Sequence, residues 1–357
     1  MAMTATAVEA AAPASVRRRG RTLVLRDAWI AGAASVAGPT EGRGPLGGRF
    51  DRIETGHLLG QPSWEMAEAE LARRAFSRLC AKLQLQPGDF DLLLGGDLLN
   101  QTVASSFAAR SLEVPLCGLY AACATFAEGL GLAATLCDAG FCRRVAVTVS
   151  SHHDAAERQY RFPTELGSQR PPTAQWTATG AVAVAVTAAV AGGGPVCLTA
   201  FTPGRVVDFA IQDPYHMGAA MAPAAADTIA ALLGDLQLRP DALGPVYTGD
   251  LARAGVPLCE ALLEQRGLQL TLRDCGVELY DPASQDVHAG GSGAACSALV
   301  AAARILPDLV AGVSERVCLC ATGALHSPTT YQQGESIPGI AHAVLLERRG
   351  QKGGSGL

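Results

Sequence analysis

A single cysteine, Cys123, stands where an extended apolar run changes into a helical pattern. Residues 118–136 surround its thiol with small side chains, which leaves room for a ligand to approach the sulfur. A thiol in the first turn of a buried helix faces the positive end of the helix dipole, and this field favours a thiolate or a bound anion. Most free cysteines are inert packing residues, however, and the chain has eleven cysteines. The position of Cys123 in the fold must decide between these two interpretations.

Histidines and arginines gather in the loop that follows the apolar segment 143–151. Five of them fall within nineteen residues: His152, His153, Arg158, Arg161 and Arg170. Such cations bind carboxylate groups through charge-assisted hydrogen bonds. Acidic residues are interspersed among them, so a solvated loop with ordinary ion pairs is an equally good interpretation for each arginine. The two histidines are stronger candidates, because they end a segment with the pattern of a buried strand.

The elements that must position these side chains occur twice along the chain, in the same order. Residues 240–255 repeat 95–102, residues 288–306 repeat the cysteine helix, residues 315–328 repeat 143–153, and residues 337–348 repeat 179–190. Four such matches predict an internal duplication into two halves of strands and helices. Ligands in such folds lie at the carboxyl ends of strands and near helix N-termini. Cys123 is therefore predicted to lie at the floor of a pocket.

Local patterns add a helix, a strand and two helix caps to this outline. Residues 64–83 have the periodicity of an amphipathic helix, and residues 22–30 alternate well enough for a first strand. Asp97 and Asp250 hold equivalent places in the two halves. We expect both carboxylates to cap the helices that follow them rather than to bind a metal.

The composition excludes several classes of protein. An apolar content of 49% with 17% charged residues is typical of a well-buried globular chain, and a net charge of −5 argues against a nucleic-acid binder. The cysteines form no C-x-x-C pair, so neither a disulfide framework nor a zinc site is expected. We expect no membrane-spanning segment, no dinucleotide site and no cofactor. The predicted boundaries are a disordered tail at 1–20, halves at 21–192 and 193–348, and a flexible tail at 349–357.

Two long segments carry a resemblance to a known family. The duplicated pattern, with a cysteine opening a helix of the first half, resembles the thiolase and ketoacyl-synthase superfamily. More narrowly, residues 152–181 and 285–298 closely resemble the stage V sporulation protein AD family, and the similarity extends over about residues 22–348. The resemblance implies an α/β fold of the thiolase type, with two duplicated halves in a layered α/β/α/β/α core. It also implies a protein that binds dipicolinic acid and helps to move it across the spore's inner membrane.

The partners that catalysis would need are missing from this chain. Condensing enzymes of the superfamily use a histidine, and a second histidine or asparagine, beside the cysteine. The first should fall within residues 246–252, where there is no histidine, and glycines including Gly291 stand at the second place. Losing one such donor typically costs about two to three orders of magnitude in rate. We therefore expect binding without catalysis and no catalytic residue. The alternative is an acyl-transferring or condensing enzyme that uses Cys123 as nucleophile with His288 or His153 as an unorthodox base.

The resemblance and the residues together predict a ligand site for dipicolinate, either free or as its calcium chelate. One carboxylate is expected over the N-terminus of the Cys123 helix and the other toward His152 and His153. The predicted ligand-binding residues are Cys123, His152, His153, Arg158, Arg161, His288 and Gly291. By resemblance, the partners are membrane proteins of the same sporulation operon, the chain lies at the periphery of the spore inner membrane, and a homodimer is possible. No nucleic acid or metal ion is expected.

Overall fold

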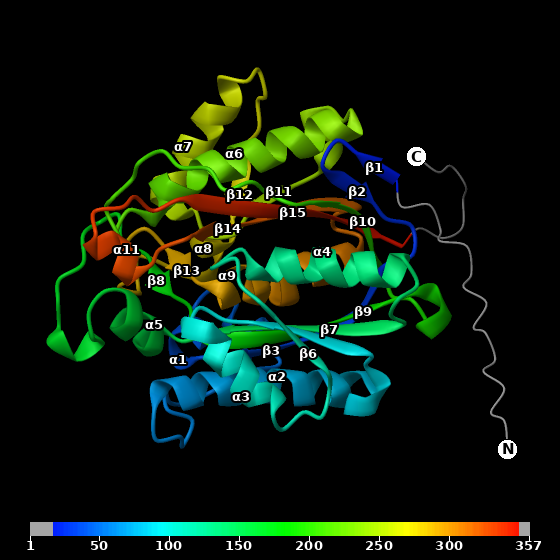
Figure 1. Cartoon of the computed structure of the whole chain (residues 1–357), viewed down its shortest axis with the longest axis horizontal. Coiled ribbons are helices and arrows are strands. Elements are labelled where there is room, and N and C mark those ends of the chain that lie inside the picture. Colours follow the sequence, from blue (N-terminus) through cyan, green and yellow to red (C-terminus); the bar gives the residue numbers. More distant parts are fainter. Residues whose placement is uncertain (1–16, 350–357) are drawn as a thin grey trace, which may run out of the picture.

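The computed structural model describes residues 17–349 and consists of five layers. Two sheets lie between three layers of helices, and Figure 1 shows α6 and α7 on one outer face, α2 and α3 on the other, and α4 and α9 in the middle. The helices are α1 (Pro39–Gly42), α2 (Trp64–Leu83), α3 (Val103–Ala109), α4 (Thr125–Asp138), α5 (His153–Tyr160), α6 (Met217–Leu236), α7 (Ala252–Glu264), α8 (Cys275–Leu279), α9 (Ala294–Val300), α10 (Leu306–Ala311) and α11 (Pro328–Gln332). The strands are β1 (Arg17–Arg19), β2 (Thr22–Val24), β3 (Trp29–Ala37), β4 (Arg52–Ile53), β5 (Leu92–Gly96), β6 (Leu116–Leu119), β7 (Arg144–Ser151), β8 (Trp176–Thr177), β9 (Gly180–Thr187), β10 (Val196–Thr202), β11 (Val246–Thr248), β12 (Leu272–Asp274), β13 (Gly291–Ser292), β14 (Arg316–Ala324) and β15 (Gly339–Arg348).

The strand order confirms the duplication. The main sheet path runs β12-β11-β14-β15-β10-β3-β9-β7-β5-β6, which reads as the same five-strand arrangement from either end. In each half the outer three strands are parallel, and the fourth strand, β9 or β15, is antiparallel to both of its neighbours. The halves join where β3 and β10 pair briefly. The predicted boundary after residue 192 falls in the connection between β9 and β10.

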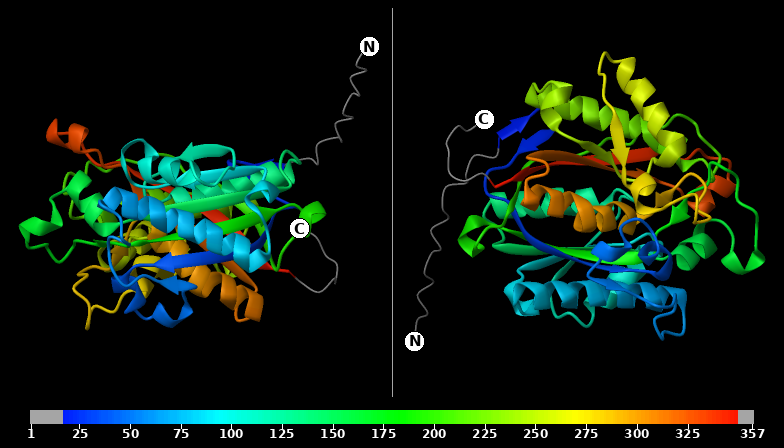
Figure 2. Two further views of the ribbon diagram at one scale, coloured as in Figure 1. Left: turned by 90° about the horizontal axis from the view of Figure 1, so that it is seen from below. Right: turned by 180° about the vertical axis from the view of Figure 1, so that it is seen from behind.

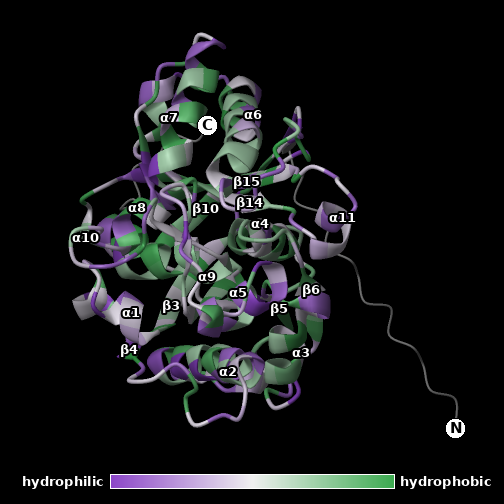
Figure 3. Ribbon diagram, turned by 90° about the vertical axis from the view of Figure 1, so that its left-hand side faces the viewer, coloured by the Kyte–Doolittle hydropathy of each residue, from purple (hydrophilic) through white to green (hydrophobic). Residues whose placement is uncertain are grey.

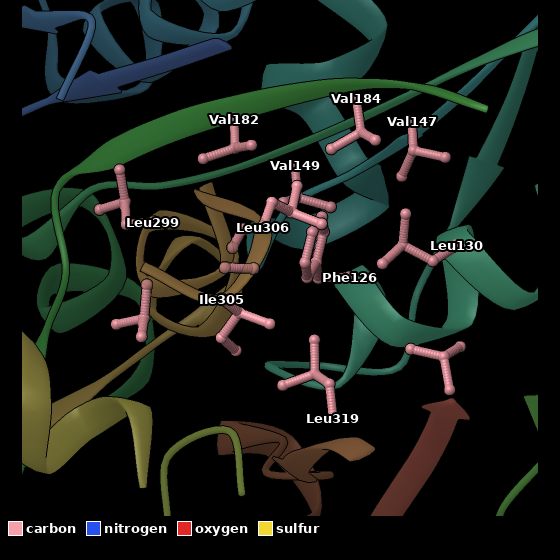
Figure 4. Packing of buried hydrophobic residues seen from close by; sticks show 14 of the residues in the cluster. Phe126, Leu130, Val147, Val149, Val182, Val184, Leu299, Ile305, Leu306 and Leu319 are labelled. Atoms are coloured by element: carbon pink, nitrogen blue, oxygen red, sulfur yellow. The ribbon is translucent and has the colours of Figure 1, made fainter. Parts of the chain in front are cut away.

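The central helices fit between the sheets because small residues line them. A Cβ at Gly129 in α4 would come within 2.7 Å of Val147 Cγ1 on β7, and one at Gly131 would collide with the ring of Phe201 on β10. The two glycines therefore let α4 approach both sheets at once. Figure 4 shows the core that results, with Phe126 and Leu130 of α4 beside valines of β7 and β9. Seen from behind in Figure 2, α9 and α10 (orange) lie in the same middle layer.

The sequence patterns predicted several elements well. The helix expected at 64–83 is α2, whose first turn is capped by Ser63 Oγ accepting from the Met66 amide at 3.3 Å. In Figure 3, α2 carries both polar and apolar residues, as an outer helix should, whereas α9 at the centre is mostly apolar. The strand expected at 22–30 is interrupted. The amides of Arg26 and Asp27 donate to Asp138 Oδ1 at 2.6 and 2.7 Å, which bends the chain between β2 and β3.

Two helices are long and apolar enough to span a membrane by composition, namely Met217–Leu236 and the continuous run Ala294–Ala311. Most of each is buried among other elements of the fold, as is usual for core helices. The tails predicted at 1–20 and 349–357 fall mostly outside the described residues. Residues 17–19 form β1, which pairs with β2.

Candidate functional site

A pocket opens beside Cys123, at the N-terminal end of α4, with about 410 Å³ of empty space, part of it open to solvent. It lies where strands of both halves end, as the duplication predicts. Its walls come from both halves and consist of Leu98, Tyr120, Ala122, Cys123, Ala156, Tyr160, Arg161, Thr177, Met217, Ser292, Ala324 and His326. A second hollow of about 630 Å³ shares Tyr120, Tyr160 and His326 and continues outward to Pro328.

The backbone turns sharply at Cys123. Ala122 has a φ of +49°, a left-handed conformation that is uncommon for a residue with a side chain. Thr125 Oγ1 ties this turn together, because it accepts from the Ala121 amide at 2.9 Å and donates to the Ala122 carbonyl at 2.7 Å. Strand β14 can approach the turn only because residue 323 is glycine, since a Cβ there would collide with the Ala121 carbonyl. The thiol thereby comes to face the second half, with Cys123 Sγ 3.7 Å from Ser292 Oγ.

A buried carboxylate, Asp250, lies behind the thiol. It accepts hydrogen bonds from Thr322 Oγ1 at 2.6 Å, Ser292 Oγ at 2.8 Å and the Gly293 amide at 3.1 Å. Burial raises the pKa of Asp250, and these hydrogen bonds oppose the rise. Burial and then the nearby charge of Asp250 raise the pKa of the Cys123 thiol well above its usual value. These effects outweigh the helix field, so the thiol is neutral at physiological pH.

Asp97 and Asp250, which hold equivalent places in the two halves, make different contacts. Asp97 accepts from the Leu99 amide at 2.9 Å and from the Ser105 amide, in the first turn of α3, at 2.8 Å, which confirms the predicted cap. The prediction for Asp250 was wrong. The amides of Leu251 and Ala252 at the start of α7 donate to Asp274 instead, at 2.8 and 3.1 Å. Asp250 is thus free to organise the wall of the pocket.

Arg161 is a buried cation in the pocket wall. Its guanidinium is paired with Glu157, one turn earlier, with Nε donating to Oε2 at 2.8 Å, and it lies 5.6 Å from the ring centre of Tyr215. Burial by itself raises the pKa of Glu157, but the hydrogen bonds and charge of Arg161 hold it below its usual value. The pair is therefore ionised and close to neutral as a unit, and it presents polar N–H groups near the pocket.

The two predicted histidines lie outside the pocket lining. His152 is buried beside Trp64, with ring centres 5.5 Å apart, and its Nε2 is 2.9 Å from the carbonyl oxygen of His57. His153 stacks on Trp176, with centres 3.5 Å apart and rings nearly parallel. Burial lowers the pKa of His153 to about 4, so the ring carries no charge at neutral pH. The chain bends from β7 into α5 at this point, and this bend sets the directions of both rings.

The other three predicted ligand-binding residues also lie outside the lining. Arg158 makes two hydrogen bonds to the carboxylate of Glu65, at 2.5 and 2.7 Å. His288 has a φ of +49°, and its Nε2 lies 3.3 Å from Asp286 Oδ1. Gly291 belongs to the short strand β13, with its free side packed against Tyr280. Of the seven predicted residues, the structure brings Cys123 and Arg161 together in one pocket.

Sequence reasoning missed five polar residues of the pocket: Tyr120, Tyr160, Thr177, Ser292 and His326. The two tyrosine hydroxyls are 3.0 Å apart, and Tyr160 donates to the Leu98 carbonyl, so Tyr120 is the donor between them. His326 Nε2 is 3.1 Å from the Tyr160 carbonyl, and burial lowers the pKa of this histidine. The duplication could have predicted His326, because residues 315–328 repeat the strand that ends in His152 and His153, and His326 follows the repeated strand.

Comparison with known proteins identifies the family. The model of the family described as Stage V sporulation protein AD matches residues 19–347. The Stage V sporulation protein AD of Bacillus subtilis (strain 168) is 44% identical over 324 residues, which cover 90% of this chain and 95% of that protein. This chain belongs to the stage V sporulation protein AD family.

Solved structures place this family member in the thiolase-like fold. A tetronic acid condensing enzyme superposes with a TM-score of 0.56 at 20% identity, covering 89% of this chain and 99% of its own. The 3-oxoacyl-[acyl-carrier-protein] synthase III of Aquifex aeolicus VF5 superposes with a TM-score of 0.55 at 13% identity, covering 90% of this chain and 99% of its own. OleA of Xanthomonas campestris superposes with a TM-score of 0.57 at 14% identity, covering 91% of this chain and 97% of its own. At these identities the likeness concerns the fold alone, and it confirms the predicted fold class.

The pocket of this sporulation protein is narrow and has both apolar and polar walls. It offers aromatic and small apolar walls, the hydroxyls of Tyr120 and Ser292, and the guanidinium of Arg161. The Cys123 sulfur lies beside the hydroxyl of Ser292 and the buried carboxylate of Asp250.

Proposed function

We propose that the protein binds dipicolinate in the pocket beside Cys123 without catalysing a reaction. It would act in uptake of the compound into the developing spore and in its release during germination. One observation carries the proposal: a buried arginine, Arg161, lies in the same narrow pocket as Cys123, two residues before α4, and the hydroxyls of Tyr120 and Ser292. One carboxylate would lie over the first turn of α4 and the other would face Arg161 rather than His152 and His153.

The size of each interaction supports a shared site. An anion at a helix end gains about 0.3–1 kcal/mol when exposed and about 2 kcal/mol when partly buried. Micromolar affinity corresponds to about −8 kcal/mol, so further contacts are needed. A hydrogen bond to a charged group adds about 1.5–3 kcal/mol, which Arg161 can supply. The calcium chelate of a dianion is neutral, and a neutral ligand suits a pocket in which Arg161 is already paired with Glu157.

The decisive experiment compares two arginines that lie close together in the sequence. We expect Arg161→Gln to weaken dipicolinate binding at least about 10-fold, because it removes a charged donor to the ligand. Arg158→Gln is the matched control, since Arg158 is engaged with Glu65 outside the pocket, and it should stay within about twofold of the wild type. Calorimetric titration with and without calcium measures both.

Picolinate, with one carboxylate, makes the same experiment sharper. The wild type should bind dipicolinate more tightly than picolinate, and Arg161→Gln should reduce that preference. Equal losses in the two arginine variants, or no binding of dipicolinate by the wild type under either condition, would refute the proposed site.

A second candidate function is acyl transfer through Cys123. The observation in its favour is His326, which lines the same pocket and has no hydrogen-bond partner at Nδ1 among the described residues. We expect no acyl-thioester to form, because burial and the negative charge of Asp250 keep the thiol neutral. Mass spectrometry after incubation with several acyl-coenzyme A thioesters tests this, and a stoichiometric adduct on Cys123 would establish the enzymatic alternative.

The proposed partners are membrane proteins encoded in the same sporulation operon, which would hold the chain at the periphery of the spore's inner membrane. The proposal rests on the family resemblance. It is tested by purifying the chain from spore membranes with and without those proteins.

A further inference from the structure

Two histidines and an aspartate converge at the end of β7, outside the pocket described above. Asp154 Oδ2 lies 3.6 Å from His57 Nδ1 and 3.7 Å from His152 Nδ1, and the three ligand atoms all lie within 4.8 Å of one another. His152 is fully buried, Asp154 is partly buried, and His57 is on the solvent side in the loop before α2. The residues come from two separate segments, so only the fold brings them together.

Both histidine nitrogens that face the aspartate lack a hydrogen-bond partner among the described residues. For His152 the tautomer follows from the contact on the other side of the ring. Its Nε2 lies 2.9 Å from the carbonyl oxygen of His57, and a carbonyl can only accept, so Nε2 carries the proton. Nδ1 of the neutral ring therefore presents a lone pair to the cluster. A backbone carbonyl that orients an imidazole in this way is typical of metal-ligating histidines.

We propose that His57, His152 and Asp154 form a binding site for a divalent transition-metal ion of the zinc class. Two imidazoles and one carboxylate suit such ions, whereas calcium and magnesium prefer oxygen ligands. Ligand atoms in a tetrahedral zinc site, with bonds of about 2.0–2.2 Å, lie about 3.3–3.5 Å apart. The two histidine–aspartate separations are larger by only a few tenths of an ångström, and the two histidine nitrogens lie within 4.8 Å of each other. A shift of the partly exposed His57 would bring all three ligand atoms to the distances of a zinc site. Solvent would complete the coordination on the side of His57.

The ion would add a bond between two parts of the chain that already meet where His152 contacts the His57 carbonyl. His57 lies in the irregular segment between β4 and α2, and Asp154 lies in the first turn of α5. A metal bond between them would hold this loop against the end of β7. The site is independent of the dipicolinate proposal, because none of its three ligands lines the pocket beside Cys123.

The test measures metal binding directly on the untagged full-length protein. Equilibrium dialysis against Zn²⁺, with excess Ca²⁺ and Mg²⁺ present, should leave one equivalent bound. The single variants His57→Ala and Asp154→Asn should each lower the affinity at least about 10-fold, since even a lost outer-shell partner costs 10–100-fold. Both residues are at least partly exposed, so these variants should fold, and thermal unfolding checks that they do.

His288→Ala is the matched control. His288 Nε2 lies 3.3 Å from Asp286 Oδ1, a histidine–aspartate pair without a second histidine, so the loss of His288 should leave zinc binding unchanged. Co²⁺ substitution identifies the donor atoms, because cysteine ligands give a strong near-ultraviolet charge-transfer band and nitrogen and oxygen ligands do not. No binding by the wild type, unchanged binding in both cluster variants, equal loss in the His288 control, or a thiolate band would each overturn the proposal.

Discussion

Cys123 illustrates how its surroundings decide what a reactive side chain does. A helix N-terminus lowers a thiol pKa by a modest amount, whereas complete burial beside a carboxylate raises it much further. In this protein burial and the neighbouring carboxylate raise the thiol pKa, because the sulfur faces Ser292 and Asp250 rather than a cation. Cys123 is therefore a small, neutral side chain in the wall of the pocket.

Enlarging this residue should matter more than removing its thiol. Cys123→Ala is expected to weaken dipicolinate binding by no more than a few fold, because it removes a weak polar contact. Cys123→Trp should abolish binding, since its ring would fill the narrow pocket. Titration of both variants with dipicolinate checks this, and circular dichroism confirms the fold. Undiminished binding by the Trp variant would place the ligand elsewhere.

At the scale of elements, a buried acid links α1 to β9 and α8. Glu41 Oε1 accepts from the Thr179 amide at 3.0 Å and from the Tyr280 hydroxyl, and Oε2 has no partner among the described residues. Burial raises the pKa of Glu41 to about 7. The folded state therefore binds a proton that the unfolded state releases near pH 4.5.

The contribution of Glu41 to stability is accordingly complete below pH 4.5 and is lost as the pH rises toward 7. At about 1.4 kcal/mol per pH unit, the loss is up to about 3 kcal/mol. Glu41→Gln keeps the acceptor and removes the titration, so the variant should lose less stability over this interval. Urea unfolding at several pH values measures the difference, and parallel pH profiles for the two proteins would contradict the assignment.

The close fit of α4 between the sheets makes a second prediction at this scale. Gly131→Ala should destabilise the protein by about 1–3 kcal/mol, because the added methyl group collides with Phe201. Gly234→Ala in α6 is the control, since open space surrounds that position and alanine favours a helix by up to about 1 kcal/mol. Urea unfolding compares the two, and a neutral Gly131 variant would show that the layers can separate.

At the scale of the whole molecule, the sheet ends in an unpaired edge at β6, where Cys117 is exposed. Exposed edges invite pairing with a second copy, and the family resemblance suggests a homodimer through such a strand. We expect a dimer by light scattering, and Cys117→Arg should weaken it by bringing like charges together across the two-fold axis. Val313→Arg, on an exposed turn between α10 and β14 in the other half, is the control. A monomeric wild type would refute the prediction.

The sequence by itself determined the fold and the general position of the site. The repeated order of segments, the all-apolar strands and the small residues of α4 are local patterns, and each is preserved in the final structure. Tertiary structure alone decided which side chains share the pocket. Arg161 and His326 line it, whereas His152 and His153 turn away, because the direction of a side chain at a strand end depends on the next turn and on packing against the other half. The contact between His57 and His152 is also long-range, because 95 residues separate the two in the sequence. Local sequence patterns cannot predict such a contact.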